Sequence, residues 1–279
     1  MSFNVNHAEI LEAVRRALEE DIGLGDVTSE ACVPVEQRAE GCFYARQDLV
    51  VAGVELLPVI FELRGGVEGL KLHKVSGDFA LSGASLAWVR GRARRLLGCE
   101  RVALNFLQRL SGVATLARRY VEAVAGTNCL VLDTRKTTPG LRRLEKMAAA
   151  AGGVTNHRMG LYDAILIKNN HIVAAGGVRA AIERTMGAEL PVEIEVRTRT
   201  ELDEALACGA TRLLLDNLTP AEAAEQIRYI AGRARVEISG GVTLENARAY
   251  AETGADFISS GAITHSAAAV NINFRLEVI

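Results

Sequence analysis

The chain has 279 residues, of which 49% are hydrophobic and 24% are charged, a balance that is typical of globular proteins and excludes a largely disordered chain. Its formal net charge of −2 excludes a uniformly basic surface for nucleic acid or an anionic membrane. The five cysteines never show CxxC spacing, which favours a reducing compartment over a disulfide framework or structural zinc. With no signal-peptide pattern and no apolar run near the ~18 residues of a membrane span, we expect a cytoplasmic protein.

The first hundred residues predict an α/β domain with an antiparallel sheet. Residues 9–19 carry apolar side chains at helical spacing, which indicates one amphipathic helix. Short β-rich runs between about 27 and 98 are separated by glycine-containing turns. A long helical pattern covers residues 99–125, with an expected break at Ser111-Gly112. We therefore predict a first domain over residues 1–108.

Beyond this point, strand-like runs alternate with helical segments. The apolar runs occupy residues 130–132, 164–167, 192–196, 212–215, 235–238 and 256–258. Capping boxes that begin at Thr200 and Thr219 indicate helix starts between them. The alternation predicts parallel β/α units, and the lack of an early GxGxxG turn favours a closed or nearly closed barrel over an open doubly wound sheet. A short run at 154–158 would give seven strands. The barrel domain is expected over residues 109–269, and a return of the alternating tail, 270–279, to the first domain is a further expectation.

Each predicted barrel strand ends in polar or glycine residues, and in β/α barrels that end holds the active site. Cations follow the early strands, carboxylates follow the middle strands, and glycines with serines follow the last two. The residues are Asp133, Thr134, Arg135, Lys136, His157, Arg158, Lys168, Asn169, Asn170, His171, Glu195, Arg197, Asp216, Asn217, Ser239, Gly240, Gly241, Ser259, Ser260 and Gly261. This sorting predicts a ligand with two chemically distinct ends.

Positive charge is concentrated near the first of these strand ends. Residues 133–171 carry seven Lys or Arg against three Asp or Glu. A solvated helix face is the simplest interpretation of three of them, Arg142, Arg143 and Lys146. Arg135, Lys136 and Lys168 instead follow apolar runs directly, and such cations suit a carboxylate or phosphate ligand. Asp133 is expected to hold these cations in place.

Several alternatives stay open on the residues alone. Glu195 and Asp216 could hold Mg²⁺ or ribose hydroxyls, or they could simply form a salt bridge or a helix cap. The Ser-Gly-Gly turn at 239–241 could hold a phosphate beside a helix N-terminus, or it could be only a tight turn. Lys168 could be the nucleophile of a Schiff-base aldolase. A sugar-phosphate binding module without catalysis is a further possibility.

Six segments, in this order and spacing, resemble the quinolinate phosphoribosyltransferase family: LDTRKTTPGLR, GGVTNHRMGLYDAILIKNNH, EIEV, LLLDN, EISGGV and ISSGAITHS. The segments EDIGLGDVTS and ERVALNFLQRLSGVAT are also similar, so the resemblance covers nearly the whole chain. It implies a homodimer with an N-terminal α/β sandwich domain and an open seven-stranded α/β barrel. A paralogue of the same shape that uses another acid, such as nicotinate, is the nearest rival.

The resemblance also implies a reaction. Quinolinate and 5-phosphoribosyl-1-pyrophosphate (PRPP) would give nicotinate mononucleotide, pyrophosphate and CO₂ in NAD biosynthesis, with Mg²⁺ and without an organic cofactor. The implied quinolinate-binding residues are Thr134, Arg135, Lys136, His157, Arg158, Lys168 and, from the neighbouring subunit, Arg101. The implied residues for PRPP and its phosphates are Glu195, Asp216, Ser239, Gly240, Gly241, Ser260, Gly261 and His171. Catalysis would rest on Lys136, Lys168, Glu195 and Asp216, and Mg²⁺ would lie at the two carboxylates, mostly through PRPP and water.

Overall fold

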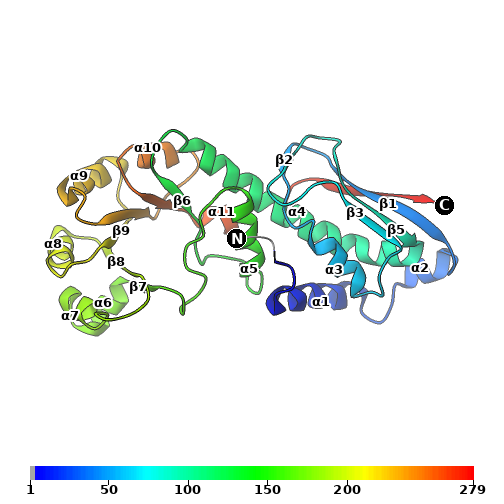
Figure 1. The fold of residues 1–279 in the computed structure, drawn as a ribbon, viewed down its shortest axis with the longest axis horizontal. Coiled ribbons are helices and arrows are strands. Elements are labelled where there is room, and N and C mark those ends of the chain that lie inside the picture. Colours follow the sequence, from blue (N-terminus) through cyan, green and yellow to red (C-terminus); the bar gives the residue numbers. More distant parts are fainter. Residues whose placement is uncertain (1–3) are drawn as a thin grey trace. The chain divides into compact units, whose positions relative to one another are not determined.

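The structure, a computed structural model, describes residues 4–279, and the chain forms two compact units (Figure 1). The first unit contains residues 4–118, 137–153 and 263–279, and the second contains residues 119–136 and 154–262. Both units are therefore assembled from segments that are distant in the sequence. Within the described residues, no helix combines the length and the apolar character that crossing a bilayer requires.

The first unit is built on a four-stranded sheet with the order β12-β1-β5-β3, in which every pairing is antiparallel. Its strands are β1 (Arg38–Ala45), β3 (Gly69–Leu72), β5 (Ser85–Arg92) and β12 (Ile272–Val278), with a separate pair, β2 (Leu49–Val50) and β4 (Phe79–Ala80). Its helices are α1 (Ala8–Ile22), α2 (Val27–Cys32), α3 (Leu56–Glu62), α5 (Arg142–Ala151), α11 (Ala262–His265) and most of α4 (Ala93–Ala123). The C-terminal strand β12 completes this sheet by pairing with β1.

Helix α4 is continuous through Ser111 and Gly112, so the predicted break there is wrong. Both residues serve close packing instead. The Ser111 hydroxyl accepts a hydrogen bond from the backbone N–H of Ala52 at 2.9 Å. A Cβ atom on Gly112 would lie 2.1 Å from the carbonyl oxygen of Ala268, so only glycine allows the two backbones to approach this closely. The small residues therefore mark a tertiary contact and not a helix end.

The prediction of a solvated helix face is wrong for Lys146 on α5, which has an exposed fraction of 0%. Four neighbours on the same helix, Leu144, Glu145, Met147 and Ala148, are also buried. The helix is thus covered around most of its circumference. Lys146 is therefore buried, although a charged side chain by itself favours contact with water. Arg143 agrees better with the prediction, because it forms an ion pair with the exposed Glu9.

The second unit contains a six-stranded parallel sheet with the order β6-β11-β10-β9-β8-β7. Its strands are β6 (Leu130–Leu132), β7 (Ile165–Ile167), β8 (Val192–Val196), β9 (Arg212–Asp216), β10 (Arg235–Ser239) and β11 (Phe257–Ser259). The first of these strands in the sequence, β6, pairs with the last, β11. The expected seventh strand is reduced to a single parallel bridge between Leu132 and Thr155. Within residues 4–279 no strand pairing joins Thr155 to β7, so the predicted open α/β barrel is confirmed with a shorter seventh strand.

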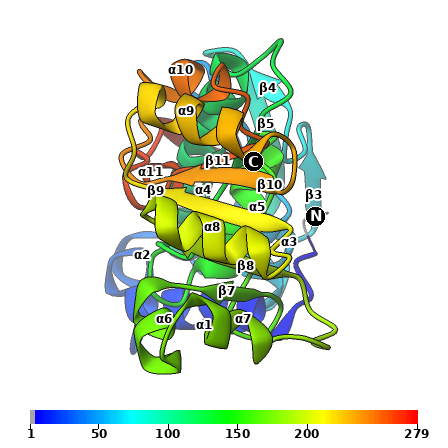
Figure 2. The same ribbon diagram turned by 90° about the vertical axis from the view of Figure 1, so that its left-hand side faces the viewer.

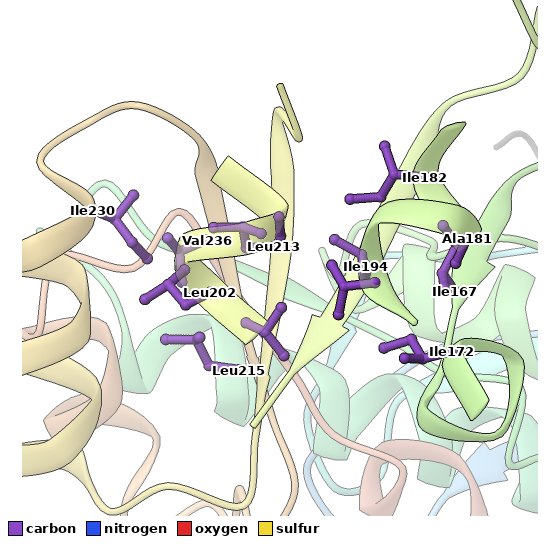
Figure 3. Close-up of a cluster of buried hydrophobic side chains, with 13 residues drawn as sticks. Ile167, Ile172, Ala181, Ile182, Ile194, Leu202, Leu213, Leu215, Ile230 and Val236 are labelled. Atoms are coloured by element: carbon purple, nitrogen blue, oxygen red, sulfur yellow. The ribbon is translucent and has the colours of Figure 1, made fainter. Parts of the chain in front are cut away.

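Helices α6 to α9 cover the outer side of this sheet (Figure 2), with α10 beside β11. Their bounds are α6 (Asn169–Ala175), α7 (Val178–Glu183), α8 (Arg199–Ala207), α9 (Pro220–Ile230) and α10 (Ala247–Ala251). A cluster of buried side chains lies between the strands and these helices (Figure 3), and includes Ile167, Ile194, Val196, Leu213, Leu215 and Val236 from the strands. Alternate residues of the same strands point to the opposite face, where they are free to be polar.

The two predicted capping boxes have different outcomes. For α9 the prediction is confirmed, since the Thr219 hydroxyl accepts from the N–H of Glu222 while the Glu222 carboxylate accepts from the N–H of Thr219. For α8 the prediction is wrong by two residues, because the cap is Thr198, whose hydroxyl accepts from the N–H of Glu201 at 3.1 Å. Thr198 has the extended backbone that a cap requires, and Thr200 already lies inside the helix.

Candidate active site

A cavity of about 400 Å³ lies at the carboxyl ends of the barrel strands, entirely within the second unit. It brings together thirteen residues predicted from the sequence, namely Thr134, Arg135, Lys136, His157, Arg158, Lys168, Glu195, Asp216, Asn217, Ser239, Gly240, Gly241 and Ser259. The remaining lining residues are Leu166, Leu214 and Glu237. Residues from six strand ends therefore meet in one place, which is the geometry that a barrel active site requires.

Strand register explains how these side chains come together. In the parallel pairing, Glu195 of β8 lies opposite Leu214 of β9, which lies opposite Glu237 of β10. One layer nearer the strand ends, Asp216 lies opposite Ser239. Side chains at equal register point to the same face of a sheet, so both rows face the cavity. The carboxylates are therefore positioned by the backbone of three neighbouring strands.

Two guanidinium groups form the basic side of the cavity. The Arg158 guanidinium donates to the carbonyl oxygen of Ala164 at 3.1 Å, which restrains it beside the strand end. Burial and the positive charge of Arg135 both lower the pKa of Arg158. Such like charges repel each other, and an anion between them would relieve the repulsion. Nearby, the N–H of Lys136 donates to the Thr134 hydroxyl at 3.1 Å and shapes the turn that carries both residues.

Asp133, which is fully buried, holds the loop that carries the next cation. One carboxylate oxygen accepts from the backbone N–H of His157 at 2.8 Å, and the other accepts from the side-chain amide of Asn156 at 2.6 Å. The residue does not line the cavity. These contacts hold residues 156 and 157, next to Arg158, and the predicted hold of Asp133 on Arg135, Lys136 and Lys168 stays a prediction.

His157 contacts two buried glutamates that sequence analysis missed, Glu193 and Glu237. Its Nε2 atom lies 3.5 Å from a Glu193 oxygen and 3.3 Å from a Glu237 oxygen, while Nδ1 accepts from the N–H of Arg158 at 2.7 Å. Burial lowers the pKa of His157, but the two carboxylates outweigh it and raise the pKa to about 9. Both ring nitrogens are therefore engaged within the protein. Sequence analysis could have found Glu193 and Glu237, because each is a glutamate within a largely apolar strand.

Two groups of side chains at the cavity could hold a cation. Glu195 and Asp216 offer carboxylate oxygens, the donors that Mg²⁺ takes together with phosphate oxygens and water. The Asp216 carboxylate accepts from the side-chain amide of Asn217 at 2.7 Å, which orients it. His157, Glu193 and Glu237 place possible ligand atoms within 4.8 Å of one another, and a set that includes an imidazole would suit a transition metal better than Mg²⁺.

The Gly240-Gly241 turn follows β10, and both residues have positive φ, 82° and 65°. A Cβ atom on Gly240 would lie 2.3 Å from the side-chain oxygen of Asn217, so a side chain cannot be accommodated there without movement. The side-chain amide of Asn246 donates to the Gly241 carbonyl at 2.9 Å and holds the turn. Helix α10 begins only at Ala247 and has five residues, so the glycine backbone and not a helix dipole is the feature available to a phosphate.

Four residues that the family resemblance assigns to ligand binding do not line the cavity, namely Arg101, His171, Ser260 and Gly261, and neither do the strand-end residues Asn169, Asn170 and Arg197. The buried Ser260 hydroxyl donates to the carbonyl oxygen of Val242 at 2.7 Å. The His171 Nδ1 atom accepts from the N–H of Lys168 at 2.9 Å, at the start of α6. Arg101 belongs to the first unit, where it is exposed on α4. Their direct contact with a ligand stays a prediction.

Comparison with known proteins matches both parts of the chain. Family models described as quinolinate phosphoribosyl transferase, N-terminal domain and C-terminal domain, match residues 26–111 and 113–275. A nicotinate-nucleotide pyrophosphorylase [carboxylating] of Mycobacterium leprae is 42% identical, over 95% of this chain and 96% of the relative. A probable enzyme of the same name from Bacillus subtilis is 39% identical, over 98% of this chain and 96% of the relative.

Solved structures agree with these sequence matches. The crystal structure of NadC from Streptococcus pyogenes has a TM-score of 0.91 and 37% identity, covering 97% of both chains. A nicotinate-nucleotide pyrophosphorylase from Ehrlichia chaffeensis also has a TM-score of 0.91, with 34% identity over 95% of this chain and 98% of the other. With models that span both units and relatives that align over nearly their full length, the chain belongs to the quinolinate phosphoribosyl transferase family.

Proposed function

We propose that this protein is a pentosyltransferase that joins quinolinate to PRPP and releases pyrophosphate and CO₂, giving nicotinate mononucleotide for NAD biosynthesis. The observation that carries the proposal is the composition of the cavity of about 400 Å³ at the carboxyl ends of the barrel strands. Cations line one part of it, and carboxylates with a glycine turn line another. The names of the full-length relatives support the same reaction.

The basic residues of the cavity are suited to the two carboxylates of quinolinate. Arg135, Lys136, Arg158 and Lys168 all line it. Guanidinium groups bind carboxylates through paired hydrogen bonds, and the repulsion between Arg135 and Arg158 is relieved when a dianion lies between them. A monocarboxylate such as nicotinate would leave part of this charge uncompensated, which is why we favour the dicarboxylate over a paralogue's substrate.

The opposite part of the cavity is suited to PRPP. Glu195 and Asp216 would face the ribose, and the turn from Ser239 to Gly241 would hold the 5′-phosphate through backbone N–H groups. A magnesium ion held by the two carboxylates and the substrate's phosphate oxygens would neutralise charge on the leaving pyrophosphate. No organic cofactor is needed for this chemistry.

The chain's residues would act mainly through charge and position. As pyrophosphate departs, positive charge develops on the ribose C1, and the Glu195 and Asp216 carboxylates stabilise it. The cations hold quinolinate so that its ring nitrogen attacks C1, a positioning effect worth about 7–11 kcal/mol in favourable cases. The ring nitrogen is then cationic and accepts the electron pair released when the 2-carboxylate leaves as CO₂. The ring carbon left behind takes up a proton.

A homodimer is part of the proposal, with Arg101 supplied to the site of the neighbouring subunit. Arg101 is exposed on α4, as a residue donated to another subunit must be before assembly. Mixing inactive Arg101→Ala and Arg135→Ala proteins tests this. Random exchange between two-fold dimers would restore about one quarter of the sites. No recovery, after subunit exchange is verified, would contradict the arrangement across the interface.

A Schiff-base aldolase is the second candidate, since Lys168 lines the cavity. Lys168 is exposed, however, and a Schiff-base lysine is usually buried among apolar groups. Borohydride trapping of a carbonyl substrate on Lys168 would favour this reaction.

The five cysteines are all free, which supports the reducing cytoplasm as the proposed compartment.

The deciding experiment mixes the protein with quinolinate, PRPP and Mg²⁺ and follows the release of pyrophosphate and CO₂. We expect the two products in equal amounts. Arg135→Ala should lower kcat/KM for quinolinate by about 100-fold, because a charged hydrogen-bond pair to a carboxylate is lost. Arg197→Ala is the control, since Arg197 follows β8, is exposed and does not line the cavity. An Arg135→Ala protein with unchanged kcat/KM would refute the assigned site.

A further inference from the structure

We propose that the second unit has another anion site, at the amino ends of β9, β10 and β11, which binds a phosphorylated small molecule. A cavity of about 650 Å³ lies there. Its lining consists of Thr211, Arg212, Ile227, Ile230, Gly232, Arg233, Ala234, Arg235, Val236, Gly254 and Asp256, none of which lines the candidate active site. The strand β9 begins at Arg212 and ends at Asp216, so the two cavities lie at opposite ends of the same strands.

Charge at this cavity is unbalanced. Three arginines, Arg212, Arg233 and Arg235, meet a single carboxylate, Asp256. One Asp256 oxygen already accepts from the backbone N–H of Val236 at 2.8 Å. Three cations beside one partly committed carboxylate favour the entry of an anion.

Strand pairing places two of these arginines next to each other. Arg212 and Arg235 lie directly opposite each other in the parallel pairing of β9 and β10, a position where like charges destabilise a sheet. Within the described part of the chain neither residue forms an ion pair, and the Nε atom of Arg212 is buried without a hydrogen-bond acceptor. A buried donor of this kind costs free energy until an acceptor reaches it. An anion would supply the acceptor and separate the two charges.

Two of the guanidinium groups are held in place before any ligand arrives. Arg233 donates to the carbonyl oxygens of Ile230 at 2.9 Å and Tyr229 at 2.6 Å. The Arg212 guanidinium carbon lies 5.2 Å from the centre of the Phe257 ring. Fixed guanidinium groups lose little conformational entropy on binding, and their planar donors match phosphate oxygens.

The remaining lining indicates the class of ligand. A volume of about 650 Å³ exceeds what inorganic phosphate needs and falls within the range of small-molecule sites. Ile227, Ile230, Ala234 and Val236 provide apolar atoms beside the arginines. A phosphate group attached to an organic body, as in a nucleoside phosphate, fits both parts of the cavity.

Calorimetric titration of the full chain with ATP and with inorganic tripolyphosphate tests this proposal. Arg235→Gln and Arg212→Gln should each weaken binding about tenfold, as expected when one guanidinium–phosphate interaction is lost. Arg228→Gln is the charge-matched control, because Arg228 is exposed on the neighbouring α9 and does not line the cavity. Any binding at the active site is common to all of these proteins and cancels in the comparison.

Tighter binding of ATP than of tripolyphosphate would assign part of the recognition to the organic body, and equal binding would assign it to the phosphates. Both results support the site. The proposal is overturned if neither probe saturates at millimolar concentration, or if Arg235→Gln binds as Arg228→Gln does. Arg235 is exposed, so its substitution gives a folded protein even if Arg212→Gln does not. The turnover of quinolinate is measured separately, so failure here leaves the proposed reaction untouched.

Discussion

Replacing Glu237 by glutamine should lower the pKa of His157 by about one unit or more. In the wild-type protein burial opposes protonation of His157, but Glu193 and Glu237 raise its pKa from the ordinary 6.5 to about 9. That increase of 2.5 units corresponds to about 3.4 kcal/mol at 1.36 kcal/mol per unit, and the His157 side chain is only 13% exposed, so little of it is screened. Glu193 and Glu237 lie at similar distances from the imidazole, 3.5 Å and 3.3 Å, so Glu237 should supply about half of the increase, about 1.7 kcal/mol.

The backbone N–H of Arg158 lowers the pKa of His157. It donates a hydrogen bond to Nδ1 at 2.7 Å, and that bond breaks when Nδ1 gains a proton. A neutral hydrogen bond is worth about 1 kcal/mol, whereas two carboxylates within 3.5 Å exert a larger attraction even in a partly polar interior. We therefore expect protonated His157 at neutral pH in the wild-type protein.

The sign of the stability effect follows from the raised pKa. Because the folded-state pKa of about 9 lies above the unfolded value, the contribution is complete below pH about 6.5 and is lost as pH rises through 9. The free energy of unfolding of the wild type should therefore fall between these pH values by up to about 3 kcal/mol, and that of Glu237→Gln should fall by about half as much.

NMR titration of the imidazole carbon-bound protons measures the pKa directly. The chain has five histidines, and His157→Gln identifies the resonance that belongs to His157. Glu225→Gln, an exposed change on α9, is the control and should leave the titration unaltered. An identical His157 pKa in Glu237→Gln and wild type would refute the reasoning, as would a wild-type His157 that titrates below its ordinary 6.5.

Three further outcomes are expected. Glu145→Gln should reduce the free energy of unfolding by about 3 kcal/mol in urea, because the fully buried Glu145 accepts from the Arg109 guanidinium at 2.8 Å; a loss under 1 kcal/mol would contradict a buried network. Gly240→Ala should lower kcat/KM for PRPP at least about tenfold in steady-state assays, since its Cβ displaces Asn217, and normal kinetics would show that the turn is not at the phosphate. Ala231→Gly should raise the thermal midpoint slightly, by about 0.5 kcal/mol of stability, because Ala231 has φ of 49°; a lower midpoint would show that backbone strain there is negligible.

Local patterns were sufficient for the barrel strands and for much of the candidate site. Apolar runs gave the barrel strands to within a residue or two, because strands buried on one or both faces require such runs wherever they occur. Strand ends in a parallel sheet meet at one edge, so the sequence alone groups Arg135, Lys168 and Asp216 at one site. The family motifs then assigned chemical roles to that group.

Contacts between distant segments were beyond the reach of such patterns. The pairing of His157 with Glu193 and Glu237 depends on strand register across residues that are up to 80 positions apart, and no local spacing encodes it. The close approach at Gly112 looked like a helix break, and Lys146 looked solvated, because burial is decided by what packs against a helix from elsewhere in the chain. The sequence alone thus determined the barrel strands and the residues that follow them, since these follow from short-range periodicity. Only the tertiary structure decided which charges are buried together, because that depends on the three-dimensional proximity of remote side chains.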